Sequence, residues 1–581
     1  MKRRKKRQRR QEQQGEDGEA LLQRGRGRRS GEVDSGGDSA DRGGDDSSRS
    51  DLECENGDRS GSDPRSEFEL REGEELSLEG IATIAVAQGC LAVQGYLITP
   101  ERGGVTVCGN ASVGWPLRCR PVFHGRYSTK GPERPERCVV RLEDASVDGV
   151  SGLAYDAGDQ ASTSSSGISR SRTYQHDVSP APDAEAAPGG WSTCLEAVVE
   201  DLCDSRSSSA PLSEITALVC GPRNAGKSSF CRQLVNSLLN SNQVVAYLEG
   251  DCGQPEFTPP GSVSLVFVDS VVVGPPFMHP RRPVRACFVG DTTPKTDPAL
   301  YLSSVEDLVG WYSNEGRAAL ARHLASTGRR GGEELAPLVI NTPGWVKGLG
   351  FEVLDRLVRR VRPKHLVQLT TGTARDLPGP AESGWEELGL AVRLPPAHSH
   401  GPPSGVSAAD TRSLMWLSFC HQCSGTALDL RGTLAQLHSK AAAGLCRTPP
   451  FRASLGSLTV MSPSPLEFPS SLLPAVLNAS LVGLARKEDI GGGACYPFLG
   501  FGIVRSVDVG SGDVFLLTNV GEEELQEVGV LVLGSVRLPQ QLLQNETFQA
   551  PYVARGAVTA EGVGAGAIKG RNNMRRGRLE G

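Results

Sequence analysis

The chain has 581 residues, with 62 Lys and Arg against 68 Asp and Glu, and therefore a formal net charge of −6. This length allows several domains with a sizeable buried core, and the 70 Gly and 38 Pro residues stay below the share expected of a wholly low-complexity chain. The near balance of charges excludes a protein that coats nucleic acid with its whole surface, although a local basic patch could still bind it.

Both ends of the chain are predicted to be disordered tails, over residues 1–67 and 554–581, because they carry few apolar side chains. Eight of the first ten residues are Lys or Arg. Such a cluster is typical of a nuclear or nucleolar targeting signal or of an arm that contacts RNA, and a solvated basic tail is the alternative. The start lacks an apolar segment and the chain has no long apolar run, so we expect neither secretion nor a membrane span.

Residues 68–149 contain short apolar runs broken by Gly and Pro, such as 81–86, 90–98, 105–107 and 138–142. Runs of this length, rich in β-branched residues, predict an N-terminal β-rich domain that resembles a sandwich or barrel. Residues 150–190 are rich in Ser, Ala and Pro, which predicts a flexible insertion or linker.

Residues 191–426 alternate between strand and helix patterns. An apolar strand over 215–220 leads into a glycine-rich loop, and Phe230, Leu234 and Leu238 then recur at helical spacing. Further strands are expected over 244–248, 264–268, 338–341 and 365–370. This alternation predicts an α/β domain with a parallel sheet covered by helices.

Residues 427–553 are mixed and contain β-like runs at 501–505, 514–518 and 528–533. We expect a separate, β-rich C-terminal domain. The 15 cysteines of the chain show no repeated spacing and are expected to be small buried side chains in a reducing compartment. Cys420 and Cys423 form one close pair without a second pair nearby, so a structural zinc site there is the minor alternative.

The glycine-rich loop has the spacing Gly-x4-Gly-Lys-Ser and lies between a strand and a helix, which is the full P-loop pattern. Small residues allow backbone N–H groups to surround phosphate oxygens at the start of a helix. Lys227 would reach the β- and γ-phosphates, and the Ser228 hydroxyl would bind Mg²⁺. The predicted ATP-binding residues are Gly221, Pro222, Arg223, Asn224, Ala225, Gly226, Lys227, Ser228 and Ser229.

A carboxylate follows the second strand of this domain, at Asp251. The carboxyl ends of parallel strands share one edge of the sheet, where ligands of open α/β folds bind. A carboxylate there can bind Mg²⁺ or accept a proton from an attacking hydroxyl. We predict both roles for Asp251, and a turn-forming Asp is the alternative. The chain lacks an Asn-Lys-x-Asp motif for reading guanine, which disfavours a GTPase.

Together with the P-loop, three segments resemble the polynucleotide 5′-hydroxyl kinase family: YLEGDCGQPEFTPPG at 247–261, GPPFMH at 274–279 and NTPGWVKGLG at 341–350. The EFTPPG and GPPF sequences look like the nucleolar branch of ribosomal RNA processing more than the branch of tRNA splicing and mRNA 3′-end formation. The resemblance is specific over about 215–370, weaker over 68–120 and 495–540, and absent from the tails and from 150–190.

The resemblance implies a role for further residues. Asp251 would be the general base on an RNA 5′-hydroxyl, and Gln254 would position metal, water or substrate. Thr342 and Trp345 match a clasp for the RNA end, in which the indole could stack on a base. A core tryptophan is the alternative for Trp345.

The family also has a lid whose arginines stabilise the transferring phosphoryl group. The matching region is about 375–415, where Arg412 is the best candidate for a catalytic arginine and Arg375 is a possible second contributor or a surface charge. The intervening sequence is rich in Pro and departs from the family's pattern. His398 and His400 lie there without a nearby carboxylate or Cys at ligand spacing, so we expect loop histidines and not a metal site.

The resulting hypothesis is an ATP- and Mg²⁺-dependent kinase that phosphorylates RNA 5′ ends during pre-rRNA processing in the nucleolus. The resemblance implies that its partner is the endonuclease that cuts the second internal transcribed spacer. One alternative is a nucleotide-stabilised scaffold for that endonuclease with little turnover. The other is a kinase of the tRNA-splicing and mRNA 3′-end branch.

Overall fold

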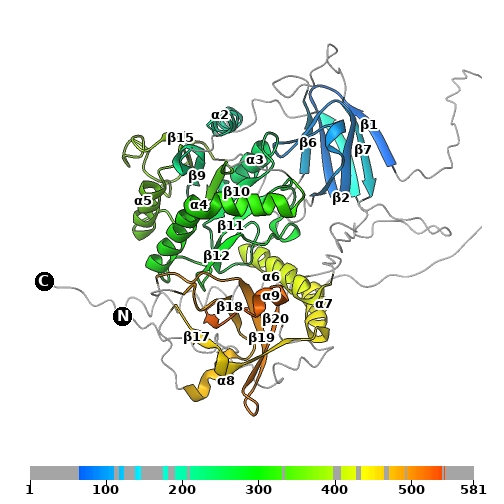
Figure 1. Cartoon of the computed structure of the whole chain (residues 1–581). Helices are drawn as coiled ribbons and strands as arrows, with labels where there is room; N and C mark the ends of the chain where they lie inside the picture. The colour runs from blue at the N-terminus through cyan, green and yellow to red at the C-terminus, as the bar shows by residue number, and fades with distance from the viewer. Residues whose placement is uncertain are drawn as a thin grey trace, which may run out of the picture. The chain divides into compact units, whose positions relative to one another are not determined.

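Three β-sheets organise the part of the chain that the structure describes (Figure 1). The structure is a computed structural model, and it describes residues 65–109, 117–122, 138–144, 174–180, 190–205, 210–329, 334–396, 407–426, 434–463, 470–490, 494–539 and 542. The predicted tails, except residues 65–67, and the loop with His398 and His400 lie outside these residues. Among the described helices, none combines the length and the apolar character needed to cross a membrane.

The first sheet confirms the β-rich N-terminal domain. Its strands are β1 (Arg65–Leu70), β2 (Glu74–Gln88), β3 (Leu91–Val93), β4 (Tyr96–Ile98), β5 (Val105–Gly109), β6 (Leu117–Pro121), β7 (Cys138–Asp144) and β8 (Tyr174–Pro180). Their order is β1-β7-β2-β6-β3-β4, and β5 and β8 also pair with β2. Leu76, Leu78, Ile84 and Val86 of the long β2 are buried, because alternate residues of a strand face the same side.

Strand β8 lies within 150–190, the segment predicted to be a flexible linker. It pairs antiparallel with the first half of β2, from Tyr174 opposite Gly80 to Pro180 opposite Glu74. The sequence YQHDVSP has little apolar alternation, so its strand conformation depends on hydrogen bonds to β2 and not on its own pattern. The rest of the predicted linker lies outside the described residues.

The second sheet contains the P-loop. Its strands are β9 (Thr216–Cys220), β10 (Val245–Glu249), β11 (Ser262–Val268), β12 (Arg285–Phe288), β13 (Leu338–Asn341), β14 (His365–Leu369) and β15 (Leu390–Leu394). They lie in the order β12-β11-β10-β13-β9-β14-β15. From β10 to β15 the pairs are parallel, as predicted.

The predicted sheet differs from the observed one at β11 and β12, which are antiparallel to their neighbours. A parallel pair needs a crossover connection, usually a helix, between its strands. The connection from β10 to β11 contains no helix, so the chain returns directly alongside β10. The apolar pattern of residues 264–268 identifies a strand but carries no information on its direction.

Helices cover both faces of this sheet. Buried side chains of α2 (Trp191–Asp204) and α3 (Lys227–Leu238) pack on one face. Those of α4 (Pro298–Ser326) and α5 (Leu349–Val361) pack on the other. Helix α4 begins where the Asp297 carboxylate accepts a hydrogen bond from Leu300 N at 2.9 Å, a standard N-cap that precedes a proline.

The third sheet forms the β-rich C-terminal part. It contains β16 (Phe451–Ser454), β17 (Thr459–Met461), β18 (Leu481–Ala485), β19 (Gly500–Asp508), β20 (Asp513–Thr518) and β21 (Val530–Leu533), with helices α6 (Ala408–Ser424), α7 (Leu434–Arg447), α8 (Leu473–Leu477) and α9 (Glu522–Leu525). Short 3-10 turns are η1 (Pro100–Arg102), η4 (Leu212–Ile215), η5 (Pro276–Met278), η6 (Leu455–Ser457) and η7 (Ser470–Leu472). One apolar core includes Phe288 of β12, Trp416 of α6 and Phe501 of β19. This core contains residues from both sides of the boundary expected near residue 427.

Candidate active site

The P-loop begins where β9 ends, and its backbone favours glycine at Gly221 and Gly226. Gly221 has a φ of 147°, and a Cβ there would lie 2.4 Å from the Leu369 carbonyl oxygen of the neighbouring β14. Asn224 and Gly226 have φ values of 63° and 95°, in the left-handed region. No side chain of the described residues caps the first turn of α3. The helix N-terminus therefore keeps its partial positive charge for a phosphate.

Lys227 is the first residue of α3 and is buried. Its Nζ donates a hydrogen bond to the Pro222 carbonyl oxygen at 3.0 Å, across the loop. Burial lowers the pKa of Lys227, and the charge of Asp251 is the largest effect in the opposite direction. A buried ammonium that donates to the Pro222 carbonyl oxygen fits a triphosphate, because phosphate oxygens would replace the water that burial removes.

Asp251 lies in the loop after β10, and its carboxylate folds back on that loop. Asp251 Oδ1 accepts hydrogen bonds from Gly253 N at 3.0 Å and from Gln254 N at 3.2 Å. Both bonds use Oδ1, so Oδ2 can still accept a proton or contact a metal ion. Asp251 thus forms a turn, as in the alternative interpretation, and it follows a strand that is parallel to the P-loop strand in the same sheet. The Gln254 side chain is exposed at the same turn.

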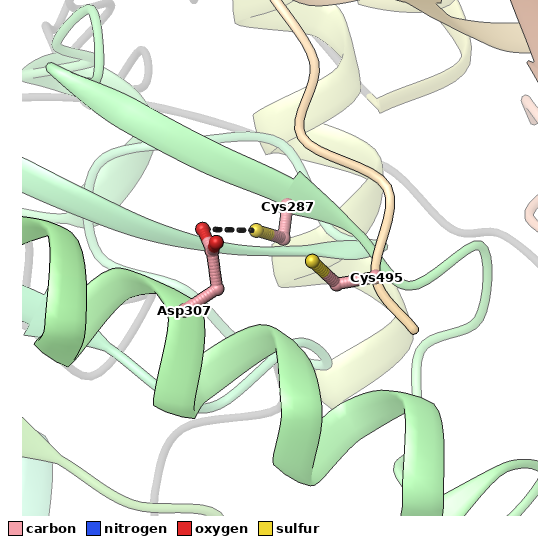
Figure 2. A group of neighbouring side chains, drawn as sticks. All are labelled: Cys287, Asp307 and Cys495. Carbon is pink, nitrogen blue, oxygen red and sulfur yellow. Dashed lines mark hydrogen bonds between the residues drawn. The ribbon is translucent and has the colours of Figure 1, made fainter. Parts of the chain in front are cut away.

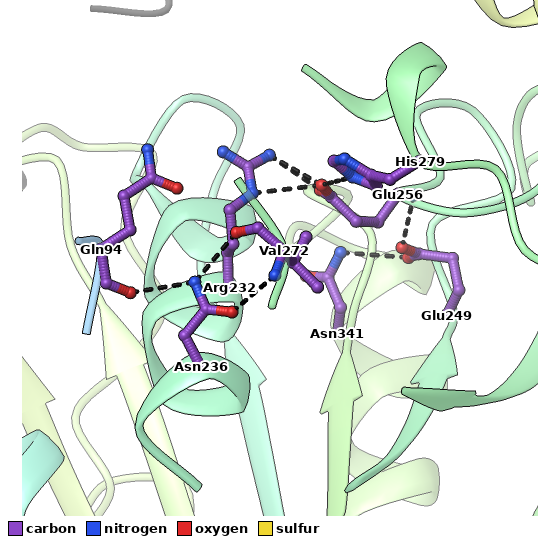
Figure 3. A network of polar contacts seen from close by, with 8 residues as sticks. All are labelled: Gln94, Arg232, Asn236, Glu249, Glu256, Val272, His279 and Asn341. Carbon is purple, nitrogen blue, oxygen red and sulfur yellow. Dashed lines mark hydrogen bonds and ion pairs between the residues drawn. The ribbon is translucent and has the colours of Figure 1, made fainter. Parts of the chain in front are cut away.

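Glu249, the last residue of β10, supports this loop from inside the protein (Figure 3). It is fully buried and accepts hydrogen bonds from Asp251 N at 2.8 Å, Glu256 N at 3.1 Å and Asn341 Nδ2 at 3.0 Å. Burial and the nearby charge of Asp251 raise the pKa of Glu249 well above its usual value. Glu249 and Asn341 therefore position the backbone that carries Asp251.

A buried ion pair joins the same loop to the P-loop helix. Arg232 of α3 donates hydrogen bonds to Glu256 Oε1 from Nε at 3.1 Å and from Nη2 at 2.8 Å. His279 Nε2 lies 2.8 Å from the same oxygen. Burial alone would raise the pKa of Glu256, but Arg232 and His279 outweigh it, and the pKa lies below its usual value. Burial lowers the pKa of His279, so we assign a neutral imidazole that donates from Nε2.

The predicted RNA clasp follows β13, the strand between β10 and β9. Thr342 is buried, and its hydroxyl donates to the Val219 carbonyl oxygen at 2.9 Å. Trp345 is partly exposed, and Lys295 Nζ lies 5.8 Å from the centre of its ring, within cation–π range. A Cβ on Gly344 would lie 2.5 Å from Arg223 Cγ. This close approach holds the clasp segment against the P-loop.

The two predicted arginines lie on different elements. Arg412 is the fifth residue of α6, which packs against η5, α7 and β20. Arg375 is exposed in the loop that leaves β14, where Asp376 accepts hydrogen bonds from Thr371 N and Thr373 N. Because β14 is parallel to β9, Arg375 is on the same sheet edge as the P-loop. The segment between the two arginines includes residues 397–406, outside the described ranges, so the lid stays a prediction.

Sequence analysis missed the supporting residues Glu249, Asn341, Arg232, Glu256 and His279. Two of them had a usable signal, because Glu249 and Asn341 are polar and end adjacent apolar strands. Arg232 lies in the middle of an amphipathic helix, and no local pattern marks it as buried. The loop from Thr292 to Lys295 was also missed. In the structure this loop lies close to the Asp251 loop, because a Cβ on Gly253 would lie 2.5 Å from the Thr292 carbonyl oxygen.

Comparisons with known proteins concern the family and the fold of the chain. A family model described as the mRNA cleavage and polyadenylation factor CLP1 P-loop matches residues 221–422, and one described as the NOL9-like C-terminal domain matches residues 446–539. A solved structure of the interface between Pcf11p and Clp1p covers 82% of this chain and all of its own, with a TM-score of 0.50 and 16% identity. At this identity the likeness shows the fold alone.

The chain is 32% identical over 389 residues to the polynucleotide 5′-hydroxyl-kinase NOL9 of Arabidopsis thaliana, over 64% of this chain and 97% of that protein. The Homo sapiens protein of the same name is 29% identical, over 56% of this chain and 50% of that protein. The polynucleotide 5′-hydroxyl-kinase GRC3 of Gibberella zeae is 31% identical, over 40% of this chain and 30% of that protein. The chain thus spans almost all of the plant relative and half or less of the other two. The resemblance found in the sequence is confirmed: the chain belongs to the NOL9/GRC3 family of polynucleotide 5′-hydroxyl kinases.

Proposed function

We propose that this chain transfers the γ-phosphate of ATP to the 5′-hydroxyl of an RNA, with Asp251 as the general base. The position of Lys227 and Asp251 at one edge of the parallel strands, at the start of α3 and directly after β10, carries the proposal. The hydroxyl oxygen bonds to the γ-phosphorus while the bond from that phosphorus to the bridging oxygen of ADP breaks. The hydroxyl proton passes to Asp251. Catalysis of this loose transfer depends mainly on position and on charge.

The P-loop residues 221–229 fit the triphosphate of ATP. Their backbone surrounds the start of α3, and Lys227 supplies a charge at the β- and γ-phosphates. The Ser228 hydroxyl is half-buried at the same helix start. Mg²⁺, held by Ser228 and by Asp251 directly or through water, would neutralise phosphate charge.

The RNA end would bind beside this site, through Gln254, Thr342 and Trp345. The buried Thr342 hydroxyl is already engaged with β9, which favours a role in positioning the clasp. The partly exposed Trp345 ring offers a stacking surface for a base, and Lys295 beside it adds charge for a phosphate. Arg375 or Arg412 would stabilise the transferring phosphoryl group.

A labelling assay with a matched control tests the proposed base. Asp251→Asn keeps an oxygen that can accept from Gly253 N and Gln254 N but removes the basic carboxylate. Asp508 makes a similar turn in the C-terminal sheet, where its Oδ1 accepts from Gly510 N at 2.8 Å. We expect Asp251→Asn and Lys227→Ala to lose transfer of labelled γ-phosphate to a 5′-hydroxyl oligoribonucleotide, while Asp508→Asn retains it. Wild-type activity in Asp251→Asn would refute the assignment of the base.

We also propose the nucleolus, pre-rRNA and a pre-rRNA endonuclease as the setting of this reaction. The match of residues 446–539 to a NOL9-like domain favours this setting over the branch of tRNA splicing and mRNA 3′-end formation. Nucleoplasmic fluorescence of a tagged copy would favour that other branch instead. Rescue of rRNA maturation by Asp251→Asn, with the endonuclease still co-purifying, would favour the scaffold alternative.

A further inference from the structure

A second group of chemically active side chains lies beside β12, the edge strand of the P-loop sheet (Figure 2). Cys287 of β12, Asp307 of α4 and Cys495 bring one ligand atom each to within 4.8 Å of one another. Cys287 Sγ lies 3.6 Å from Asp307 Oδ2. Cys287 is fully buried, and Cys495 and Asp307 are partly exposed.

The backbone fixes both cysteines. Residues 496–498 pair with β12, because Phe288 N donates to the Tyr496 carbonyl oxygen at 2.8 Å and Phe498 N donates to the Ala286 carbonyl oxygen at 3.1 Å. Cys287 forms an isolated antiparallel bridge with Pro497. The segment before β19 therefore extends the edge of the P-loop sheet, and the two thiols meet there because of backbone pairing.

The donor set and its spacing fit a tetrahedral zinc ion. Thiolates and carboxylates are zinc ligands, with Zn–S near 2.3 Å and Zn–O near 2.1 Å. At a tetrahedral angle these bond lengths separate sulfur and oxygen by about 3.6 Å, which equals the spacing of Cys287 Sγ and Asp307 Oδ2. Cys495 Sγ lies within 4.8 Å of both of these atoms and can be the third ligand.

Arg285 holds the carboxylate of the group in place. Its Nε donates to Asp307 Oδ2 at 2.8 Å and its Nη2 donates to Asp307 Oδ1 at 3.2 Å. Arg285 Cζ also lies 5.8 Å from the centre of the Trp311 ring. Two thiolates, one carboxylate and Zn²⁺ leave one negative charge, which Arg285 offsets. A hydrogen-bonded partner behind a ligand is the usual arrangement in metal sites.

We propose that Cys287, Cys495 and Asp307 bind one Zn²⁺ ion, with its fourth position open to water, and that the ion joins the edge of the P-loop sheet to the segment before β19. The proposal is independent of the kinase chemistry. It also differs from the zinc alternative weighed for Cys420 and Cys423, which the structure places inside α6 as buried thiols of the apolar core.

Metal analysis of the purified full-length chain tests the site. We expect one zinc per chain after dialysis in the wild type, loss of that zinc in Cys287→Ala and Cys495→Ala, and retention in Cys446→Ala, whose cysteine is also half-buried. Arg285→Gln should weaken zinc binding by about 10- to 100-fold, as loss of a supporting hydrogen bond does. Exchange of zinc for Co²⁺ should produce a thiolate-to-cobalt charge-transfer band in the wild type and in Cys446→Ala.

The cobalt spectrum needs only wild-type protein, so absence of the thiolate band counts against the site even where Cys287→Ala does not fold. Wild-type protein without stoichiometric zinc and without a thiolate band after cobalt addition would overturn the site. A disulfide between Cys287 and Cys495, seen by mass spectrometry of unreduced peptides, would overturn it as well. Zinc that remains in both cysteine variants would mean that another group binds the ion. None of these readouts depends on phosphoryl transfer.

Discussion

Replacing Lys227 by Met separates the cost of a buried charge from its use in binding nucleotide. Met has a similar length and no charge. In the chain without nucleotide, Lys227→Met removes one charge-assisted hydrogen bond, to the Pro222 carbonyl oxygen, which contributes about 1.5–3 kcal/mol. It also removes the cost of burying the ammonium, which is of similar size after relaxation. We therefore expect the free energy of unfolding to stay within about 1 kcal/mol of wild type.

Nucleotide binding should respond much more strongly. ATP at 100 times its Kd stabilises the wild type by about 2.7 kcal/mol. Losing about 3 kcal/mol of phosphate contacts would raise the Kd roughly 100-fold. The same ATP concentration would then stabilise Lys227→Met by only about 0.4 kcal/mol.

Thermal unfolding with and without Mg-ATP, together with 5′-end labelling, measures both effects. The exposed Lys487 of the C-terminal part provides a control: Lys487→Met should keep the full ATP-induced shift. If Lys227→Met also kept the full ATP-induced shift, Lys227 would not contact phosphate. A Lys227→Met protein that unfolds far below wild type without ATP would show that the ammonium is structural.

Three further predictions concern the buried loop and the clasp. Arg232→Met should lower the free energy of unfolding by about 3–5 kcal/mol, because it leaves the Glu256 carboxylate buried without its main partner. As a control, Arg356→Met, at an exposed pair 3.8 Å apart, should lower it by less than about 1 kcal/mol. Denaturant titration measures both losses, and equal losses would contradict the burial argument. Acidification should destabilise the fold, because burial holds the pKa of His279 below its usual value of 6.5. The unfolded chain then binds the proton first, and stability present above pH 6.5 is lost as the pH falls toward the folded pKa. His279→Gln should flatten this decrease in unfolding midpoint, and an unchanged slope would assign it to other groups. Trp345→Ala should weaken RNA binding by about 1–3 kcal/mol in a filter-binding assay without changing ATP binding, and unchanged RNA affinity would identify a core tryptophan.

The sequence was most informative where function depends on consecutive residues. The P-loop is contiguous, and Gly221, Gly226, Lys227 and Ser228 each have a local reason for their residue type. Asp251 could be placed because it follows a strand that runs parallel to the P-loop strand in the same sheet, and the carboxyl ends of parallel strands share one edge. In such cases the order of the residues along the chain is enough to predict where they lie on the sheet.

Features that depend on long-range pairing were inaccessible. The direction of β11 depends on which neighbour it meets, and the strand character of β8 comes from β2. The approach of Cys287 and Cys495 depends on a backbone pairing between segments that are far apart in the chain. The burial of Arg232 depends equally on Glu256, which lies on another element. Composition and periodicity record what a segment can do, but not which segment it meets.

Helix α3 connects the phosphate site with the N-terminal sheet. Its first residue is Lys227, its second turn carries Arg232, and the fully buried Asn236 follows one turn later. Asn236 Nδ2 donates to the carbonyl oxygens of Gln94 at 3.0 Å and Val272 at 2.9 Å, and Gln94 belongs to the turn between β3 and β4 (Figure 3). Arg232 and Asn236 are four residues apart and therefore share one face of the helix. A displacement of this turn would therefore act on the helix that holds the P-loop, which gives the N-terminal domain a physical route to the active site.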